Sequence, residues 1–270
     1  MSNQQIVEVF FRRRWPDGFR CPFCAFPEFY LISTRSLPLY ECRHCRRQTS
    51  VTSGTIMHKT RTPLAKWAAA VEALSSSSGL NACRLAEAIG VTRKTACTML
   101  RKFRQAIAEA EESRKLEGVV YGSLFALAPK YFWVFLPDRR YRKERVVSLC
   151  AAFDASGAPI ALKLHTAEER DLKPGTKEAT TDGIRRMLAR AARAGAAATW
   201  LSGWKKCPEA LNEGFRGARR WLNLTFHGLR TKYLQSYLHE YCFRWNLAAR
   251  GASAREEWFA LCTAGIPRVG

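Results

Sequence analysis

The feature that most constrains how this chain can fold is a double pair of cysteines near its N-terminus. Cys21 and Cys24 form one CxxC motif, Cys42 and Cys45 form a second, and residues 25–41 separate them. Two thiolates at this spacing can turn towards one ion, and a second pair brought alongside completes a tetrahedron that is closed to water and therefore structural. Because soft sulfur ligands in tetrahedral geometry favour zinc, the sequence predicts a structural Zn²⁺ site.

The residues between the two motifs have the composition of a β-hairpin. Residues 29–32 and 37–41 are predicted to be its strands, which would bring the two cysteine pairs together. His44 lies between the last two cysteines and could replace one of them, although we expect it to point outward. The alternatives are four unrelated thiols or a redox CxxC motif, and the repeated spacing argues against both. Four further cysteines lie in apolar periodic contexts and are predicted to be core residues: Cys83, Cys97, Cys150 and Cys242.

The charge of the chain indicates a polyanionic partner. Its 270 residues include 44 Lys and Arg against 23 Asp and Glu, which gives a formal net charge of +21. Such an excess predicts binding to nucleic acid or to an acidic membrane surface, and the alternative is a merely soluble basic protein. No targeting segment and no apolar run of membrane-spanning length is visible, so we expect a cytoplasmic, nucleoid-associated protein with no membrane partner.

Residues 64–112 have a helical pattern that favours a helix-turn-helix. Asn81 is predicted to cap a short helix over 82–89 that ends at Gly90, and Thr92 is predicted to cap the next helix. The inner face of this pair would consist of Leu85, Ile89, Val91, Ala96 and Leu100. Base edges are usually met near the start of the second helix, so the predicted DNA-binding residues are Arg93, Lys94, Thr95, Thr98 and Arg101. A three-helix bundle with a basic solvated face is the alternative.

Beyond the charged segment 109–117 the pattern changes from helices to strands. Strands are expected at 119–127, 131–136, 146–153 and 159–164, with a turn at 154–157 between the last two. A helix over 181–194, a short strand over 196–201 and helices over 233–246 and 253–262 are expected to follow. The sequence therefore predicts an α+β multidomain protein with a zinc ribbon over 1–50, a connector over 51–63, a helix-turn-helix over 64–112 and an α/β layer domain over 117–270.

Several segments along the chain resemble bacterial insertion-sequence transposases of the IS1595 group, the ISXO2-like transposases. They are Trp15 to Gly18, Ser50 to Ile56, Pro63-Leu64 with Trp67, Lys94 to Ala96, and Leu234, Tyr237-Leu238, Glu240 and Phe243 to Asn246. The resemblance implies a zinc ribbon, a helix-turn-helix and an RNase H-like catalytic domain that holds two metal ions with two Asp and a Glu. Carboxylates are needed there because hard oxygen ligands must hold the paired dications that bridge the attacking and leaving oxygens.

This chain departs from the family's pattern at those carboxylates. Ser123 stands in place of the first Asp and Ser202 in place of the second, and the segment bearing the Glu is largely missing. Serine hydroxyls cannot replace carboxylates as ligands for hard dications, so the RNase H-like domain is predicted to be degenerate. Five other acidic residues are candidate replacements. Asp154 is expected in a hairpin turn, Asp171 in a loop and Asp182 at a helix N-terminus. Glu213 lies away from the position of the expected Glu, and Glu240 is expected to pair with Arg244 along a helix.

Three hypotheses follow from this combination. The first is a non-catalytic protein that binds double-stranded DNA as a regulator or accessory factor, with the degenerate domain as scaffold, clamp or homo-oligomer surface. Four basic runs would then contact phosphates: Arg139 to Lys143, Arg185-Arg186, Lys205-Lys206 and Arg219 to Trp221. The second is an active transposase that uses displaced carboxylates and requires Mg²⁺ or Mn²⁺. The third, a decaying chain without a selected role, is disfavoured by the intact core periodicity.

Overall fold

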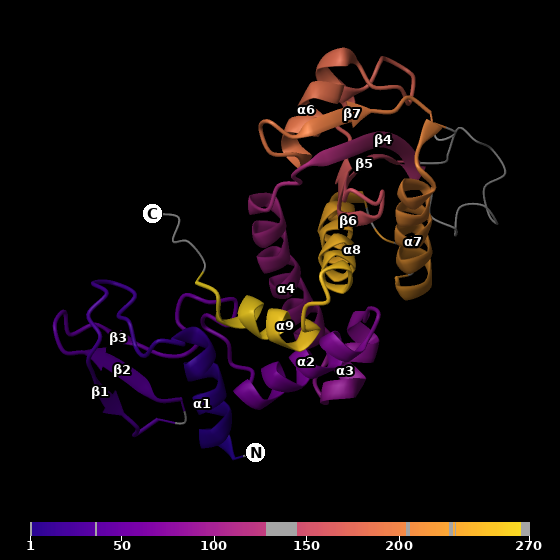
Figure 1. Cartoon of the computed structure of the whole chain (residues 1–270). Helices are drawn as coiled ribbons and strands as arrows, with labels where there is room; N and C mark the ends of the chain where they lie inside the picture. The colour runs from indigo at the N-terminus through magenta and orange to yellow at the C-terminus, as the bar shows by residue number, and fades with distance from the viewer. Residues whose placement is uncertain are drawn as a thin grey trace. The chain divides into compact units, whose positions relative to one another are not determined.

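The computed structural model of this chain divides into two compact units (Figure 1). Unit 1 comprises Met1–Ala106 and Ser253–Gly270, and unit 2 comprises Ile107–Ala252. The structure describes residues 2–35, 37–127, 145–203, 206–226, 229 and 231–265. The expected strand over 131–136, the basic run 139–143, Trp204 and Lys205 lie outside the described residues. No helix in the described part of the chain is long and apolar enough to cross a membrane.

Unit 1 begins with a helix that the sequence analysis did not predict. Helix α1 (Asn3–Arg14) starts at a capping box in which Ser2 Oγ accepts from the amide of Gln5 and the Gln5 side chain accepts from the amide of Ser2. Its buried positions are Ile6, Val7 and Phe10. The polar N-terminal residues obscure this helix in the sequence, because only a narrow stripe of its surface is apolar.

The predicted hairpin between the cysteine motifs is present. Strands β1 (Phe29–Ile32), β2 (Leu39–Cys42) and β3 (Gln48–Thr49) form an antiparallel sheet in this order. Its hydrophobic support is a group of rings whose centroids lie 4.9–6.1 Å apart, contributed by Phe11, Trp15, Phe19, Phe29 and Tyr40. Aromatic rings of α1 and of the sheet thus form one small core, which fixes the hairpin against the helix.

The helical part of unit 1 contains α2 (Leu64–Ser76), α3 (Ala82–Ile89), α9 (Ala254–Thr263) and the part of the long helix α4 (Arg93–Ser113) up to Ala106. Phe103 on α4 lies between two tryptophans, with ring centroids 5.6 Å from Trp67 and 5.4 Å from Trp258. Trp258 belongs to α9, so the end of the described chain packs in unit 1. From its place along the chain alone, α9 would be grouped with the residues of unit 2 that precede it. The domain limits expected from the sequence stay a prediction.

Unit 2 is built on a mixed four-stranded sheet with the order β6-β5-β4-β7. Strands β4 (Val119–Leu127), β5 (Arg145–Phe153) and β6 (Pro159–Thr166) pair antiparallel, whereas β7 (Ala197–Trp200) adds to β4 in parallel. The predicted turn between β5 and β6 is closed by Asp154, whose carboxylate accepts from the amides of Ser156 and Ala158. These four strands agree with the expected ranges to within about two residues.

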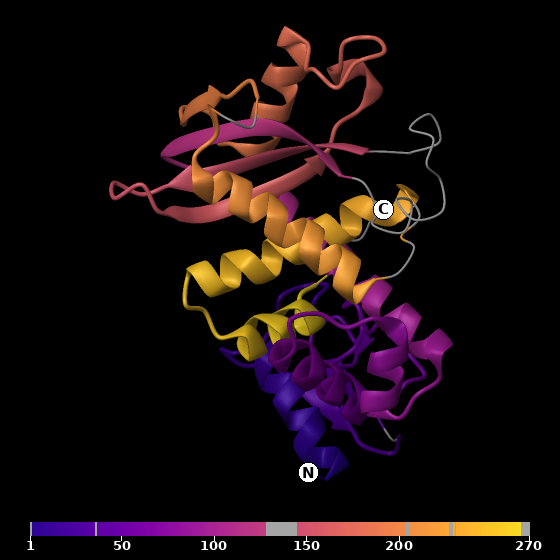
Figure 2. The ribbon, with the colours of Figure 1, turned by 90° about the vertical axis from the view of Figure 1, so that its right-hand side faces the viewer.

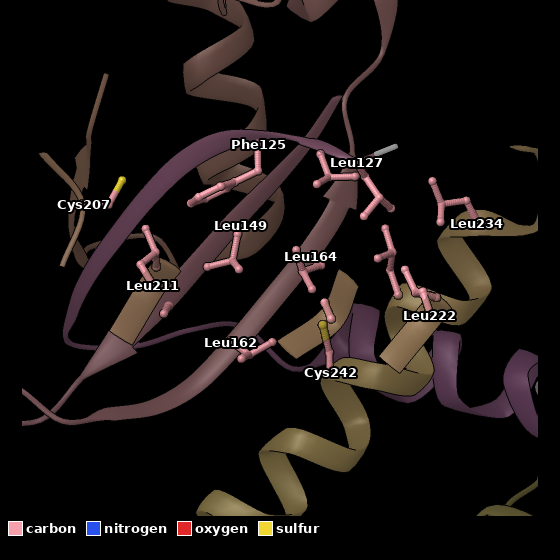
Figure 3. Close-up of a cluster of buried hydrophobic side chains, with 14 of the residues drawn as sticks. Phe125, Leu127, Leu149, Leu162, Leu164, Cys207, Leu211, Leu222, Leu234 and Cys242 are labelled. Carbon is pink, nitrogen blue, oxygen red and sulfur yellow. The ribbon is translucent and has the colours of Figure 1, made fainter. Parts of the chain in front are cut away.

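Helices cover both faces of this sheet. Helix α6 (Thr181–Ala191) lies on one face, and α7 (Glu209–Thr225) and α8 (Leu234–Ala249) lie on the other (Figure 2). Figure 3 shows Phe125 and Leu149 of the strands directed into one cluster with Leu211 and Leu222 of α7. Alternate strand residues point to opposite faces, so β4 sends Phe125 to this cluster and Val120 to the α6 side.

Helix α7 is absent from the sequence expectations, and two glycines within it explain why. Gly214 and Gly217 lower the helix propensity of the segment. The packing against α8 requires a small residue at one of them, since a Cβ atom on Gly217 would lie 2.4 Å from the Tyr241 hydroxyl. That hydroxyl donates to the Gly214 carbonyl at 3.2 Å. Close approach to α8 therefore takes precedence over local propensity in α7.

Side-chain amides on α8 satisfy the free edge of β6. The Asn246 amide accepts from the Leu162 amide at 2.8 Å and donates to the Leu162 carbonyl at 3.1 Å. Gln235 likewise accepts from the Thr166 amide at 2.7 Å and donates to the Leu164 carbonyl at 3.0 Å. Because an unpaired edge is a template for further strands, these two amides both stabilise unit 2 and protect its edge.

We predict that Asn246→Ala lowers the free energy of unfolding of unit 2 by about 2–4 kcal/mol, because it leaves both backbone groups of Leu162 buried without a partner. Urea unfolding and amide hydrogen exchange measure this, and the Leu162 amide should exchange faster. The exposed substitution Glu213→Ala on α7 is the control and should change stability by less than about 0.5 kcal/mol. Equal effects of the two substitutions would contradict the edge role of Asn246.

Candidate metal centre and nucleic-acid interface

The four cysteines of the two CxxC motifs meet at one point in unit 1. The Cys21 and Cys45 sulfurs lie 3.6 Å apart, those of Cys24 and Cys42 lie 3.5 Å apart, and all four lie within 4.8 Å of one another. A tetrahedral zinc with Zn–S bonds of about 2.3 Å requires sulfurs separated by about 3.8 Å. The donor set and its spacing therefore fit a structural zinc, which these four thiolates would hold with no position left open for a reacting group.

Two turns of the same geometry present these sulfurs. In the first turn the Ala25 amide donates to the Cys21 carbonyl at 2.8 Å, and in the second the Arg46 amide donates to the Cys42 carbonyl at 3.0 Å. Ala25 and Arg46 also share a left-handed backbone, with φ of 60° and 58°. A non-glycine residue adopts this conformation at a cost, and four bonds to a metal are a sufficient reason for the chain to retain it twice.

The surroundings of the cysteines favour thiolates at Cys42 and leave His44 outside the cluster. Desolvation raises the pKa of Cys42, but hydrogen bonds from the backbone amides of Cys45 and His44 act against it and lower this pKa to about 7. The His44 side chain is exposed and its ring lies 5.6 Å from the Phe26 ring. The expectation that His44 points outward is confirmed.

Two of the cysteines predicted to be core residues are instead exposed. Cys150 and Cys242 are buried as expected, but Cys83 and Cys97 are exposed on α3 and α4. Cys97 is four residues from both Arg93 and Arg101, which places it on the outer face of α4. Cys97 was predicted to be a core residue because it is adjacent in sequence to Ala96, which is buried. One residue along a helix turns the side chain away from the core.

Helices α3 and α4 are joined by a tight turn that local hydrogen bonds of Asn81, Gly90 and Thr92 stabilise. Asn81 Oδ1 accepts from the amides of Cys83 and Arg84, which caps α3 as predicted. Gly90 ends the helix with φ of 62°, and its amide donates to the carbonyls of Ala86 and Glu87. Thr92 Oγ1 then accepts from the Thr95 amide at 3.2 Å at the start of α4.

One contact that holds this turn was not visible in the sequence. Lys66 on α2 donates from Nζ to the Ile89 carbonyl at 2.6 Å, at the C-terminal end of α3. A cation there satisfies a free carbonyl and opposes the negative end of the helix dipole. The contact spans 23 residues along the chain, so no local sequence pattern could have revealed it.

The outer face of α4 presents most of the predicted DNA-binding side chains to solvent. Arg93, Lys94, Thr98 and Arg101 are exposed, whereas Thr95 is half-buried and its hydroxyl lies 3.0 Å from that of Thr92. The opposite face is apolar, with Leu85, Ile89, Ala96 and Leu100 buried and Val91 half-buried. The first turn of α4 contains two cations and no carboxylate.

Ser123 and Ser202, the positions at which the sequence analysis expected aspartates to be replaced, lie near each other in unit 2. Ser123 is buried in β4, and its hydroxyl donates to the Leu201 carbonyl at 2.8 Å. Ser202 is exposed immediately beyond that carbonyl. In the part of the chain that the structure describes, the four cysteines are the only group of three or more His, Cys, Asp or Glu placed to hold a metal ion.

Three of the other carboxylates considered as possible ligands pair with arginines. Asp171, which was expected in a loop, is buried and pairs with Arg186 at 2.7 Å. Asp182 pairs with Arg185 at 2.9 Å in the first turn of α6. Glu240 is buried and pairs with Arg244 at 3.0 Å, as predicted from their spacing. Arg186 therefore supports Asp171, and the run Arg185-Arg186 is only partly a free cationic surface.

Comparison with known proteins identifies the N-terminal segment. Residues 1–48 match the family model described as the transposase zinc-ribbon domain, of the IS1595 type. No curated protein matches the chain. The matched residues contain α1, the hairpin and all four cysteines, so this segment is an IS1595-type transposase zinc-ribbon domain.

We predict that Cys24→Ser lowers the zinc content of the purified chain from about one ion to well below one and unfolds the ribbon, since zinc binding supplies the folding free energy of such small modules. Metal analysis and the loss of near-ultraviolet circular dichroism from the ring cluster measure these effects. Cys83→Ser and Cys97→Ser are matched controls, because both thiols are exposed outside the cluster. Zinc retained by the Cys24 variant but lost by a control would contradict the assignment.

Proposed function

We propose that this transposase-related chain binds double-stranded DNA through its zinc ribbon and a helix-turn-helix formed by α3 and α4, and that it acts on that DNA as a regulator or accessory factor without catalysis. The observation that carries the proposal is the outer face of α4. Arg93 and Lys94 are exposed at the helix start, and a turn fixed by Asn81, Gly90 and Thr92 sets its direction. A rigid basic helix start of this kind suits entry into the major groove.

The electrostatics of the whole chain support this partner. A net charge of +21 attracts the phosphate backbone from a distance and supplies affinity that does not depend on base sequence. In the ribbon, one exposed arginine lies within the second motif and another directly after it, with the guanidinium of Arg43 4.8 Å and that of Arg46 5.6 Å from the centre of the exposed Tyr30 ring. Such a surface offers phosphate contacts beside the base contacts proposed for α4.

The proposal assigns an RNase H-like fold to unit 2 and no catalytic role. A mixed sheet in which three antiparallel strands are extended by one parallel strand, with helices on both faces, supports that fold. Ser123 and Ser202 support the loss of catalysis, because neutral hydroxyls replace the carboxylates that a two-metal reaction requires. Ser123 is moreover engaged by the Leu201 carbonyl, so its hydroxyl is not directed at a ligand.

DNA binding is tested by substituting the exposed cations of α4. Lys94→Gln should weaken binding by roughly fivefold to tenfold and reduce the slope of log affinity against log salt by about 1, if Lys94 contacts a phosphate. Fluorescence anisotropy with duplex DNA at two or more salt concentrations measures both quantities. Arg193→Gln is the control, since this exposed arginine lies in unit 2 and pairs with Glu117. Unchanged binding in both Lys94→Gln and Arg101→Gln variants would exclude α4 as the DNA-binding helix.

Catalysis is tested by incubating the protein and a bound duplex with Mg²⁺ or Mn²⁺. We expect no nicking and no strand transfer, because neutral serines at positions 123 and 202 do not bind hard dications. The double variant Ser123→Asp and Ser202→Asp has a carboxylate at both positions, and its metal binding by unit 2 can be compared with that of the unsubstituted chain. Metal-dependent cleavage by the unsubstituted chain that is lost on neutralising one carboxylate would establish the active-transposase alternative and refute this part of the proposal.

A further inference from the structure

A cavity of about 750 Å³ lies in unit 2 at the carboxyl ends of the parallel strands β4 and β7. Its walls come from four places: the last residues of β4, the residues that follow β7, one side of α7, and the loop before α6 together with α6 itself. Ligands of α/β sheets bind outside the carboxyl ends of the strands, and this volume is in the usual range of about 300–1,000 Å³ for small-molecule sites. The described carboxylates do not make it a metal site.

Two aromatic rings line the cavity, Trp200 from the α6 side of the sheet and Phe215 from the α7 side. The Phe215 ring stacks on that of Phe125 with centroids 4.6 Å apart and planes 19° from parallel. Trp200 lies so close to Gly122 that a Cβ atom there would be 3.0 Å from the indole. Both lining rings are therefore fixed by their own neighbours, and a planar group can lie against either of them with little loss of side-chain entropy.

The charged side chains around the cavity are mainly cationic. Lys173, Lys177 and Arg216 line it, and Glu178 is the one carboxylate among the lining residues. Lys173 pairs with Glu178 at 2.8 Å, and Arg216 pairs with Glu209, but these four side chains are more than half exposed. Exposed ion pairs are weak, so these cations can turn to a bound anion at little cost.

The lining thus has the opposite electrostatic sign from a site for dications. We propose that this cavity binds a nucleotide, with the planar base against the ring of Trp200 or that of Phe215 and the phosphate held by Arg216 and the two lysines without a metal ion. A free mononucleotide and an unpaired nucleotide at a DNA strand end offer the same chemistry. Binding of a strand end rests on the proposed DNA binding, whereas binding of a free mononucleotide does not.

Isothermal titration with deoxyadenosine monophosphate tests the cavity directly. We expect adenosine and inorganic phosphate to bind at least about tenfold more weakly, because each lacks one of the two recognised groups. Arg216→Gln should weaken binding of the mononucleotide by about tenfold. Ser202→Trp should abolish it by filling the cavity from an exposed position. Arg193→Gln is the matched control, an exposed arginine that also pairs with a glutamate but lies outside the lining.

A second arm compares a blunt duplex with the same duplex carrying a three-nucleotide overhang. Tighter binding of the overhang that Ser202→Trp removes, without binding of the mononucleotide, supports the proposal with a strand end as the source. Loss of blunt-duplex binding in the α4 variants with mononucleotide binding intact separates the two functions. The proposal is overturned if neither the mononucleotide nor the overhang binds, if binding is unaffected by Ser202→Trp and Arg216→Gln, or if inorganic phosphate binds as tightly as the mononucleotide.

Discussion

The parallel pairing of β4 with β7 is the constraint on which the arrangement of unit 2 depends. It sets Gly122 opposite Trp200, so the indole can lie where any larger residue on β4 would collide with it. It also brings the Ser123 hydroxyl to the Leu201 carbonyl. Only four residue pairs form this ladder, and β5, β6 and α6 all lie between its two strands in the sequence. A shift by one residue would turn Trp200 to the other face and remove a wall of the cavity.

A buried pair of charged residues, Lys163 of β6 and Glu111 of α4, is a second constraint on unit 2. Lys163 is buried in β6 and donates to the Glu111 carbonyl, while the Glu111 carboxylate lies 3.8 Å from its ammonium group. Burial raises the pKa of Glu111 and lowers that of Lys163, and the opposite charge of each partner acts against this shift. Asn246 reaches the same carboxylate at 3.4 Å. Removing one member would leave a buried charge, which specifies how the end of α4, β6 and α8 meet.

The sequence predicted the local elements well and the long-range ones poorly. Cysteine spacing gave the hairpin and the metal cluster because both depend on neighbours in sequence, and Asn81 with Gly90 gave the limits of α3 for the same reason. Helix α7 was missed because its glycines serve contacts with α8. Likewise, the contact of Lys66 with Ile89, the ion pair of Asp171 and the position of α9 in unit 1 all join distant residues. No periodicity encodes such contacts.

The same distinction applies to the cavity of unit 2, because the fold around it does not depend on carboxylate ligands. The backbone at the ends of β4 and β7 is held by ladder bonds and by the packing of Trp200 and Phe215, neither of which needs a carboxylate. A neutral Ser123 can be buried against the Leu201 carbonyl, where a charged group without a metal would have to leave water at a cost of several kcal/mol. The cations Arg216 and Lys173 line the cavity. Under the proposal above they attract a phosphate directly, and binding it requires no rearrangement of the backbone.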